Sequence, residues 1–271
     1  MSTMPQVSNE TLHLPEGEIH LWSANVQDFA VAELIVIAQE WLSERELARY
    51  QRLQVAAQRH RFLLGRWLLR QTLSRYLGSE PAQWQFVENE YGKPALASAD
   101  AQLQFNLTHS GDFIVLVLAT NHELGVDIEY SHRERRFQAL GERHFSASEV
   151  AALQRCAASS DSSLKQHYFY QLWTLKEACL KAVGSGLVLP LDGFSFDLSQ
   201  PKNLHMDVDA SVQTSAKSSG HWQVWQLEFA ADYELAVALR SQERLTTQLA
   251  SWRCKDFQAI EKCDLSIRRQ L

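Results

Sequence analysis

The chain has 271 residues, of which 45% are hydrophobic and 21% charged, as expected for a globular protein with a substantial core. Its formal net charge of -6 argues against a strongly basic nucleic-acid-binding protein, so no nucleic acid is expected as a partner. The four cysteines form no CxxC pair, which argues against a zinc site or a disulfide framework. The N-terminal residues lack an apolar signal core, and no apolar run approaches membrane-spanning length. We therefore expect a cytoplasmic protein with reduced thiols and no membrane association.

The first half of the chain shows strand alternation, then helical periodicity, then strand alternation again. Gly78 is well placed to end the second helix, and Gly92 and the residues 109–112 mark turns. The predicted elements are a strand at 18–22, helices at 31–52 and 55–77, a strand within 84–94 (WQFVENEYGKP), and two strands within 103–119 (LQFNLTHSGDFIVLVLA).

The second half repeats this order loosely. Ser146 and Glu149 have the spacing of a capping box at the start of a helix. The predicted elements are a strand at 123–130, helices at 147–156 and about 164–183, a loop at 157–163, strands at 193–198, 222–229 and 233–240, and a polar turn region at 207–220.

This order of elements predicts an α+β fold with two similar halves related by a pseudo-twofold, each with an antiparallel sheet packed by helices. We place the halves at 18–123 and 124–240. The tail, 241–271, can be helical, and the sequence gives it no role.

The segment GVDIE (125–129) holds the first group of candidate site residues. Side chains two positions apart on a strand share a face, so Asp127 and Glu129 should point the same way. Two adjacent carboxylates repel each other unless they are solvated or share a cation such as Mg²⁺. Two exposed acids at a strand end are the simpler interpretation.

The helix that contains LWTLKEACLKAV (172–183) holds the second group. Glu177 and Lys181 are four residues apart and lie on the same helix face, which is usual for a surface salt bridge. Glu177 also lies at the edge of the apolar face, where it could add a third carboxylate to the acidic pair. Lys181 could then bind a phosphate, while Lys176 is left as a solvated residue.

The segment 45–75 is strongly basic, with eight arginines against the single acid Glu46. Guanidinium groups bind phosphates well, although a solvated helix face explains some of these arginines. Lys93 follows the turn at Gly92, and Thr108 and His109 stand near the second predicted turn. Such residues can all donate to a phosphate.

The ordered set EYGKP, FNLTHS, GVDIE and LWTLKEACLKAVGSGL resembles the 4′-phosphopantetheinyl transferases, above all the surfactin-synthetase-activating (Sfp-like) class. The resemblance covers about residues 40–200, and the strands continue it to about 240. It implies a single-chain, monomeric enzyme that moves 4′-phosphopantetheine from coenzyme A to a serine of an apo acyl or peptidyl carrier protein. Adenosine 3′,5′-bisphosphate is released, and the reaction depends on Mg²⁺.

The resemblance also implies roles for individual residues. The metal ligands would be Asp127, Glu129 and Glu177, and the coenzyme A contacts would be Arg49, Arg61, Lys93, Thr108, His109 and Lys181. Threonine stands at position 108 where the family commonly has serine, so the hydroxyl is kept. Glu46 stands where relatives have a lysine, which leaves Arg45 as a substitute.

The catalytic base and the carrier stay open at this point. Glu177 is the first candidate for the base, acting directly or through a metal-bound water, and Glu129 is the second. Another magnesium-dependent phosphotransferase or phosphohydrolase could use the same acids. A non-catalytic carrier-binding protein should lack an acid at 127, 129 or 177, and all three acids are present.

Overall fold

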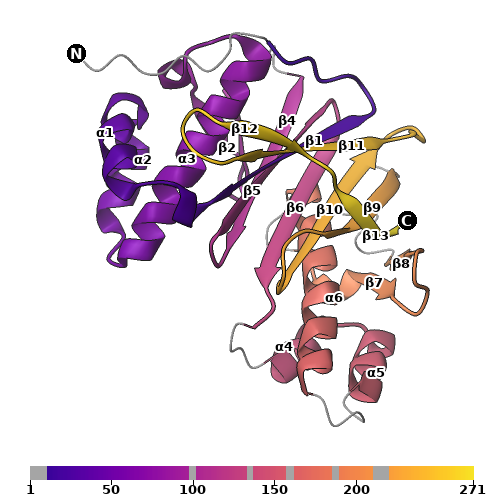
Figure 1. Cartoon of the computed structure of the whole chain (residues 1–271). Helices are drawn as coiled ribbons and strands as arrows, with labels where there is room; N and C mark the ends of the chain where they lie inside the picture. Colours follow the sequence, from indigo (N-terminus) through magenta and orange to yellow (C-terminus); the bar gives the residue numbers. More distant parts are fainter. Residues whose placement is uncertain (1–10, 98–101, 133–136, 157–161, 185–188, 210–219) are drawn as a thin grey trace. The chain divides into compact units, whose positions relative to one another are not determined.

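The computed structural model describes residues 11–97, 102–132, 137–156, 162–184, 189–209 and 220–271 (Figure 1). The chain forms two compact units. The first comprises 1–87, 94–121 and 247–264, and the second comprises 88–93, 122–246 and 265–271. Each unit has its own cluster of buried hydrophobic side chains.

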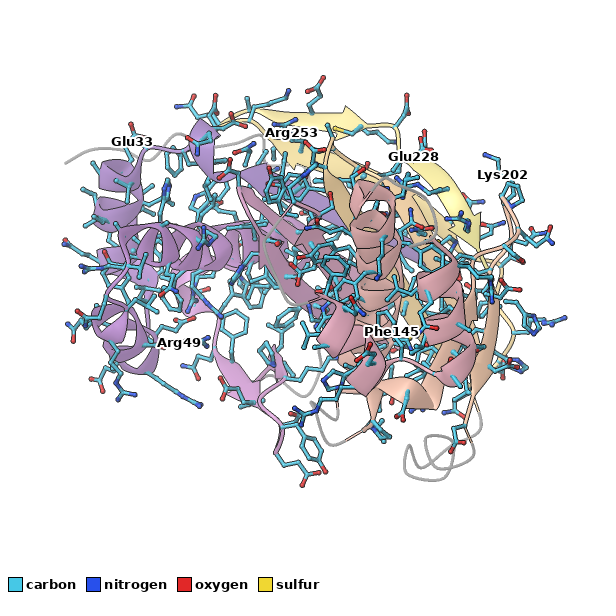
Figure 2. The ribbon with its side chains drawn as sticks, turned by 90° about the horizontal axis from the view of Figure 1, so that it is seen from below. Glu33, Arg49, Phe145, Lys202, Glu228 and Arg253 are labelled. Atoms are coloured by element: carbon cyan, nitrogen blue, oxygen red, sulfur yellow. The ribbon has the colours of Figure 1, made fainter. Side chains whose placement is uncertain are left out.

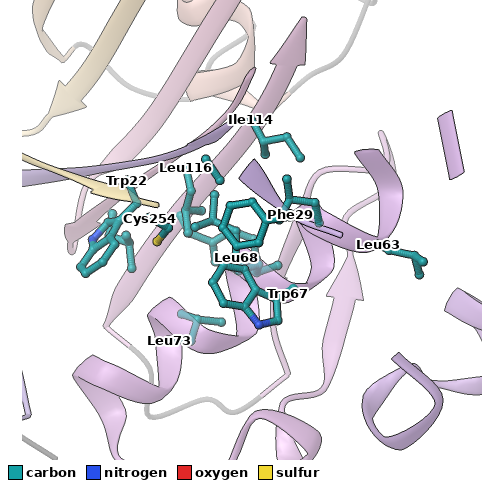
Figure 3. Packing of buried hydrophobic residues seen from close by; sticks show 14 of the residues in the cluster. Trp22, Phe29, Leu63, Trp67, Leu68, Leu73, Ile114, Leu116 and Cys254 are labelled. Carbon is teal, nitrogen blue, oxygen red and sulfur yellow. The ribbon is translucent and has the colours of Figure 1, made fainter. Parts of the chain in front are cut away.

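The first unit is built on a five-stranded sheet with the order β12-β11-β1-β5-β4. These strands are β1 (Glu18–Asn25), β4 (Leu103–Ser110), β5 (Phe113–Thr120), β11 (Gln248–Cys254) and β12 (Ile260–Cys263). Its helices are α1 (Val31–Trp41), α2 (Glu44–Arg52) and α3 (Ala56–Leu77). Figure 3 shows side chains of α3, among them Trp67 and Leu68, in one buried cluster with Leu116 of β5.

The second unit is built on a four-stranded antiparallel sheet with the order β13-β9-β10-β6. These strands are β6 (Glu123–Tyr130), β9 (His221–Glu228), β10 (Tyr233–Ser241) and β13 (Ser266–Gln270). The helices are α4 (Phe137–His144), α5 (Ala147–Cys156) and α6 (Ser162–Val183), and α6 packs on β6 and β10. Phe145, which follows α4, is buried in the core of this unit and is labelled in Figure 2.

The two halves repeat the same order of elements, which confirms the predicted α+β fold with two similar halves. In each half a strand is followed by helices, the last of which has 22 residues, then by a two-stranded pair and a hairpin. The pairs are β2 (Phe86–Glu88) with β3 (Pro94–Leu96), and β7 (Phe194–Asp197) with β8 (His205–Val208). The strand order β1-β5-β4 corresponds to β6-β10-β9.

Residues 31–52 form two helices, so the prediction of one continuous helix is wrong. Ser43 ends the run because its Oγ accepts a hydrogen bond from the Glu46 amide (3.3 Å), while the Glu46 carboxylate accepts one from the Ser43 amide (3.0 Å). This reciprocal cap starts a new helix. The helix α4 was not predicted at all.

The tail is not helical. The strand β11 pairs in parallel with β1 and β12 pairs with β11, while β13 pairs with β9. The pairings of β11 with β1 and of β13 with β9 join residues more than 30 positions apart, so local periodicity could not reveal them. The predicted loop at 157–163 and the predicted turn region at 207–220 lie largely outside the described residues.

Two expectations from composition can be compared with the described part of the chain. All four cysteines are free thiols. No described helix combines the length and the apolar composition needed to cross a membrane.

Candidate active site

The strand β6 directs Gly125, Asp127 and Glu129 to one face, on which α6 packs. The side chains of both acids are buried, with 6% of Asp127 and 8% of Glu129 exposed. The simpler interpretation of two exposed acids at a strand end is therefore wrong. Burial of two carboxylates on one face requires an opposing charge.

Gly125 determines how closely α6 approaches β6. A Cβ atom at this position would lie 2.1 Å from the carbonyl oxygen of Ala178 and 2.4 Å from the amide nitrogen of Ala182. The helix backbone thus packs directly against the strand backbone. The sequence interpretation missed this role, although a glycine inside a strand is a known signal of close backbone approach.

This close packing brings Lys181 to Asp127. The Lys181 ammonium lies 2.6 Å from Asp127 Oδ1 and donates to the carbonyl oxygen of Val126 at 3.2 Å. The structure therefore joins the two motifs that spacing alone could not connect. Lys181 pairs with an acid of the strand across the helix–sheet contact.

The electrostatics of Asp127 show that two more acids act on it. Burial is the main cause that raises the pKa of Asp127 to about 7, and the negative charges of Glu129 and Glu177 contribute to this rise. The Lys181 ammonium opposes this shift by favouring the ionised form. The charges of Glu129 and Glu177 thus disfavour ionisation of Asp127, and the Lys181 ammonium offsets them in part. An added cation would offset them further.

Carboxylate oxygens are the ligands that Mg²⁺ prefers, so the chemistry of Asp127, Glu129 and Glu177 suits this ion. Within the described residues, however, no three acidic, histidine or cysteine side chains converge into a preformed metal-binding cluster. Asp127 Oδ1 is instead engaged by Lys181. The three carboxylates are suitable ligands for Mg²⁺. Their side chains would have to move closer together to bind the ion.

Lys176 contacts other elements than Lys181 does, and the prediction that it is solvated is wrong. Its side chain is fully buried, and its ammonium lies 2.7 Å from Glu149 Oε2, which is also fully buried. The ammonium also donates to the carbonyl oxygens of Leu191 and Phe194. Glu149 accepts from the Ser146 amide at 2.8 Å, as the predicted capping box requires. Lys176 therefore anchors α6 to α5 and β7.

Lys93 is held at the end of α6. Its ammonium donates to the carbonyl oxygens of Ala182 (2.9 Å) and Leu124 (3.1 Å). Burial lowers the pKa of Lys93 to about 8, an effect that the nearby charge of Glu123 partly opposes. The residue thus belongs to the second unit, beside the strand and the helix that carry the acids.

The remaining candidate residues belong to the first unit. Thr108 and His109 lie on β4, before the turn at Gly111, and they alternate between a buried and an exposed side chain. Arg61 on α3 donates to the carbonyl oxygen of Gly111 at 3.3 Å, close to the end of β4. Arg49 is exposed on α2, with its guanidinium 5.7 Å from the Phe62 ring centroid (Figure 2).

Glu46, the departure from the family pattern, has a structural role here. Its carboxylate lies 2.7 Å from Arg70 and 3.5 Å from Arg66, in addition to capping α2. Arg70 is buried and also donates to the carbonyl oxygens of Pro81 and Trp84. These contacts give two of the eight arginines, Arg66 and Arg70, a structural role that needs no bound phosphate.

Comparison with known proteins shows the family of the chain. The family model of the 4′-phosphopantetheinyl transferase superfamily matches residues 123–238, and that of the 4′-phosphopantetheinyl transferase N-terminal region matches residues 21–121. The 4′-phosphopantetheinyl transferase HetI of Nostoc sp. is 35% identical over 193 residues, which are 68% of this chain and 75% of that relative.

Two further relatives have similar names. A phosphopantetheinyl transferase of Thraustochytrium sp. is 31% identical over 211 residues (74% of this chain, 73% of the relative). The 4′-phosphopantetheinyl transferase Sfp of Bacillus subtilis is 32% identical over 178 residues (66% and 73%). The chain belongs to the 4′-phosphopantetheinyl transferase superfamily. Within it, the chain is an enzyme of the Sfp-like type, as its motifs predicted.

Proposed function

We propose that this enzyme transfers 4′-phosphopantetheine from coenzyme A to a serine hydroxyl of an apo acyl or peptidyl carrier protein. The serine Oγ forms a bond to the phosphorus that bears pantetheine, and the bond from that phosphorus to the bridging oxygen breaks. The electron pair leaves with adenosine 3′,5′-bisphosphate, and the serine proton passes to a base. The observation that carries this proposal is the acidic group around Asp127, with Lys181 bound to it, in a chain of this superfamily.

The three acids Asp127, Glu129 and Glu177 would hold Mg²⁺. The bound ion would supply positive charge to the pyrophosphate of coenzyme A, which carries developing negative charge as the bond breaks. Asp127 and Glu129 are buried on β6, so they can offer only a limited range of positions. Such restriction suits ligands of a small octahedral ion.

Glu177 is our first choice for the base that accepts the serine proton, and Glu129 is the second. Glu177 is only partly buried on α6, so a substrate hydroxyl can reach it, whereas Glu129 is 8% exposed. Lys181 pairs with Asp127 before substrate binds, and it would bind a phosphate oxygen of coenzyme A afterwards.

The contacts to the other coenzyme A phosphates are proposed for Arg49, Arg61, Thr108 and His109. Arg61 and His109 are supported by their common position near the turn at Gly111. Threonine, histidine and arginine side chains all donate hydrogen bonds to phosphate. The monomeric state and the cytoplasmic location predicted from the sequence are part of this proposal.

The test is incubation of the purified enzyme with coenzyme A, Mg²⁺ and a panel of apo carrier proteins from fatty-acid, polyketide and nonribosomal-peptide synthesis. Mass spectrometry should show that a carrier gains one phosphopantetheine, and chromatography should show an equal amount of adenosine 3′,5′-bisphosphate. Glu177→Gln should lose most of this activity while keeping its melting temperature. Release of phosphate or nucleotide with no mass gain on any carrier would instead indicate a phosphohydrolase.

A further inference from the structure

The turn between β2 and β3 is shaped by the side chain of Asn89. Asn89 Oδ1 accepts hydrogen bonds from the amides of Tyr91 (3.0 Å) and Lys93 (2.9 Å), and the Asn89 amide donates to the Lys93 carbonyl oxygen (3.0 Å). Asparagine commonly organises turns in this way. Residues 88–93 belong to the second unit, whereas the residues on both sides of the turn belong to the first.

The turn donates two hydrogen bonds to the C-terminal end of α6. Asn89 Nδ2 donates to the carbonyl oxygen of Gly184 (2.8 Å), and Lys93 Nζ donates to that of Ala182 (2.9 Å). The last four carbonyl groups of a helix have no partner within the helix. A cation at this end is also favoured by the helix dipole. Asn89 and Lys93 together therefore cap α6 from a segment far away in the sequence.

Lys93 also reaches β6. Its ammonium donates to the carbonyl oxygen of Leu124 (3.1 Å), the residue before Gly125. One ammonium group thus joins the last turn of α6 to the strand that carries Asp127. The residues next to these two carbonyl groups are Lys181 on the helix and Gly125 on the strand, which are the residues that set the distance between α6 and the acids.

Gly184 allows the turn to lie against the helix end. Its φ of +70° is in the left-handed region, as is common for a glycine that ends a helix. A Cβ atom here would lie 2.7 Å from Cδ of Lys93 and 3.3 Å from Nδ2 of Asn89. A side chain at this position would therefore push away both capping groups.

We propose that Asn89, Lys93 and Gly184 form a clamp that fixes the last turn of α6 against β6, and that Lys93 is a positioning residue for the acidic site. The clamp holds Lys181 and Glu177 at their distances from Asp127. Lys93 then acts through carbonyl oxygens of the protein, in contrast to the phosphate contact that the sequence predicts for it. The effect on turnover rests on the proposed function, whereas the clamp itself does not.

The clamp is tested first by hydrogen exchange of the unliganded protein, followed by mass spectrometry of peptides from the end of α6. The Gly184 amide donates to the carbonyl oxygen of Leu180 (2.9 Å), so its exchange reports on the last helical turn. Lys93→Met, Asn89→Ala and Gly184→Ala should each speed exchange at 181–184 by roughly tenfold or more, because the helix end opens more often. Glu90→Gln, an exposed position in the same turn, should match the wild type.

If Lys93 served only to bind a phosphate, its loss would not affect the unliganded protein. All four variants would then exchange at the wild-type rate, and that result would overturn the clamp. Lys93→Met and Asn89→Ala combined should exchange little faster than either alone, because both act on the same helix end.

Transfer kinetics then separate the two roles of Lys93. A clamp predicts that Lys93→Met and the uncharged change Asn89→Ala both lower kcat by about tenfold and leave KM for coenzyme A within about threefold. A direct phosphate contact predicts a raised KM in Lys93→Met alone, which contradicts the clamp. If no carrier is modified by the wild type, the proposed function fails, and the exchange result still decides the clamp.

Discussion

Asp127 illustrates a conflict between stability and function at a single residue. Its carboxyl group is buried beside Glu129 and Glu177, and these surroundings raise its pKa to about 7. A protein selected for stability alone would have a neutral residue here. The ionised form is needed to bind a cation, so the site keeps a charge that the unliganded fold disfavours.

Asp127→Asn should therefore be more stable than the wild type near pH 8 in the presence of a chelator, and it should lose transfer. The folded wild type keeps a proton on Asp127 up to about pH 7, whereas the unfolded chain releases it near the ordinary aspartate pKa of 3.8. Wild-type stability thus falls as the pH rises between these values. Melting temperatures from pH 4 to 8 should show a difference that is largest at pH 8 and vanishes near pH 4.

Asp256 provides a control of opposite sign. Its carboxylate accepts hydrogen bonds from the amides of Gln258 and Ala259 (both 2.7 Å), which lower its pKa. The contribution of Asp256 to the stability of the fold is present above its unfolded pKa and is lost as the pH falls. Asp256→Asn should thus melt slightly below the wild type at neutral pH. A similar loss of melting temperature in Asp127→Asn at pH 8 would contradict the raised pKa of Asp127.

Lys176 shows how a motif residue can be structural. Lys176→Met would leave Glu149 as an unpaired buried charge, and breaking such a pair typically costs about 3–5 kcal/mol. Urea unfolding at pH 7 should show this loss. Lys165→Met on the same helix removes a charge with weak contacts, to Gln138 at 3.5 Å and to the Phe137 ring centroid at 5.9 Å, and should cost less than about 1 kcal/mol. Equal losses in the two variants would rule out the anchoring role.

At the scale of elements, the packing of α6 on β6 depends on Gly125. Gly125→Ala would place a methyl group 2.1 Å from a backbone oxygen of the helix, so α6 must move away. We expect a loss of about 1–3 kcal/mol from overpacking and a fall in kcat of at least about tenfold, because Lys181 leaves Asp127.

Gly65→Ala is the matched control for this change. Its Cβ would meet the Leu107 side chain at an ordinary 3.4 Å, inside the helix α3. Alanine is favoured over glycine in helices by up to about 1 kcal/mol. Gly65→Ala should thus keep its kcat and melt at or above the wild-type temperature. If Gly125→Ala behaves in the same way, close packing is not needed for the site.

The sequence predicted those parts of the fold that depend on local patterns. The bounds of β6, α3 and α6 follow from periodicity and from glycine stops, and the candidate acids follow from motifs on these elements. The burial of Lys176 and the approach at Gly125 could not be predicted, because both depend on which segment covers the residue. The site pairing of Asp127 with Lys181 was missed for the same reason.

At the scale of the whole chain, the C-terminal tail completes both sheets. The strands β11 and β12 extend the first sheet beyond β1, and β13 extends the second beyond β9. The register of β13 shifts between Ile267 and Arg269, which indicates a bulge. This bulge allows two consecutive arginines to contact the same buried face.

That face carries Glu234, which is fully buried and directly opposite Glu129 in the register of β10 and β6. The carboxylate of Glu234 lies 2.6 Å from Arg268 and 2.7 Å from His167 of α6. Like charges directly opposite each other destabilise a sheet, so Arg268 offsets one of the two acids. Through this ion pair β13 stabilises β10, which pairs with β6, the strand that carries Asp127 and Glu129.

Arg268→Gln should destabilise the protein by about 3–5 kcal/mol, because a buried carboxylate loses a cation. Arg269→Gln, in the same strand, loses its hydrogen bonds to two neutral groups, the Gln226 side chain (2.6 Å) and the Gln200 carbonyl oxygen (3.0 Å), and should cost only about 1–2 kcal/mol. Adding Glu234→Gln to Arg268→Gln should restore most of the loss, since the charge that needed a partner is gone. Urea unfolding at pH 7 measures all three variants. If Arg268→Gln and Arg269→Gln lose stability equally and Glu234→Gln restores nothing, β13 contributes only its backbone pairing with β9.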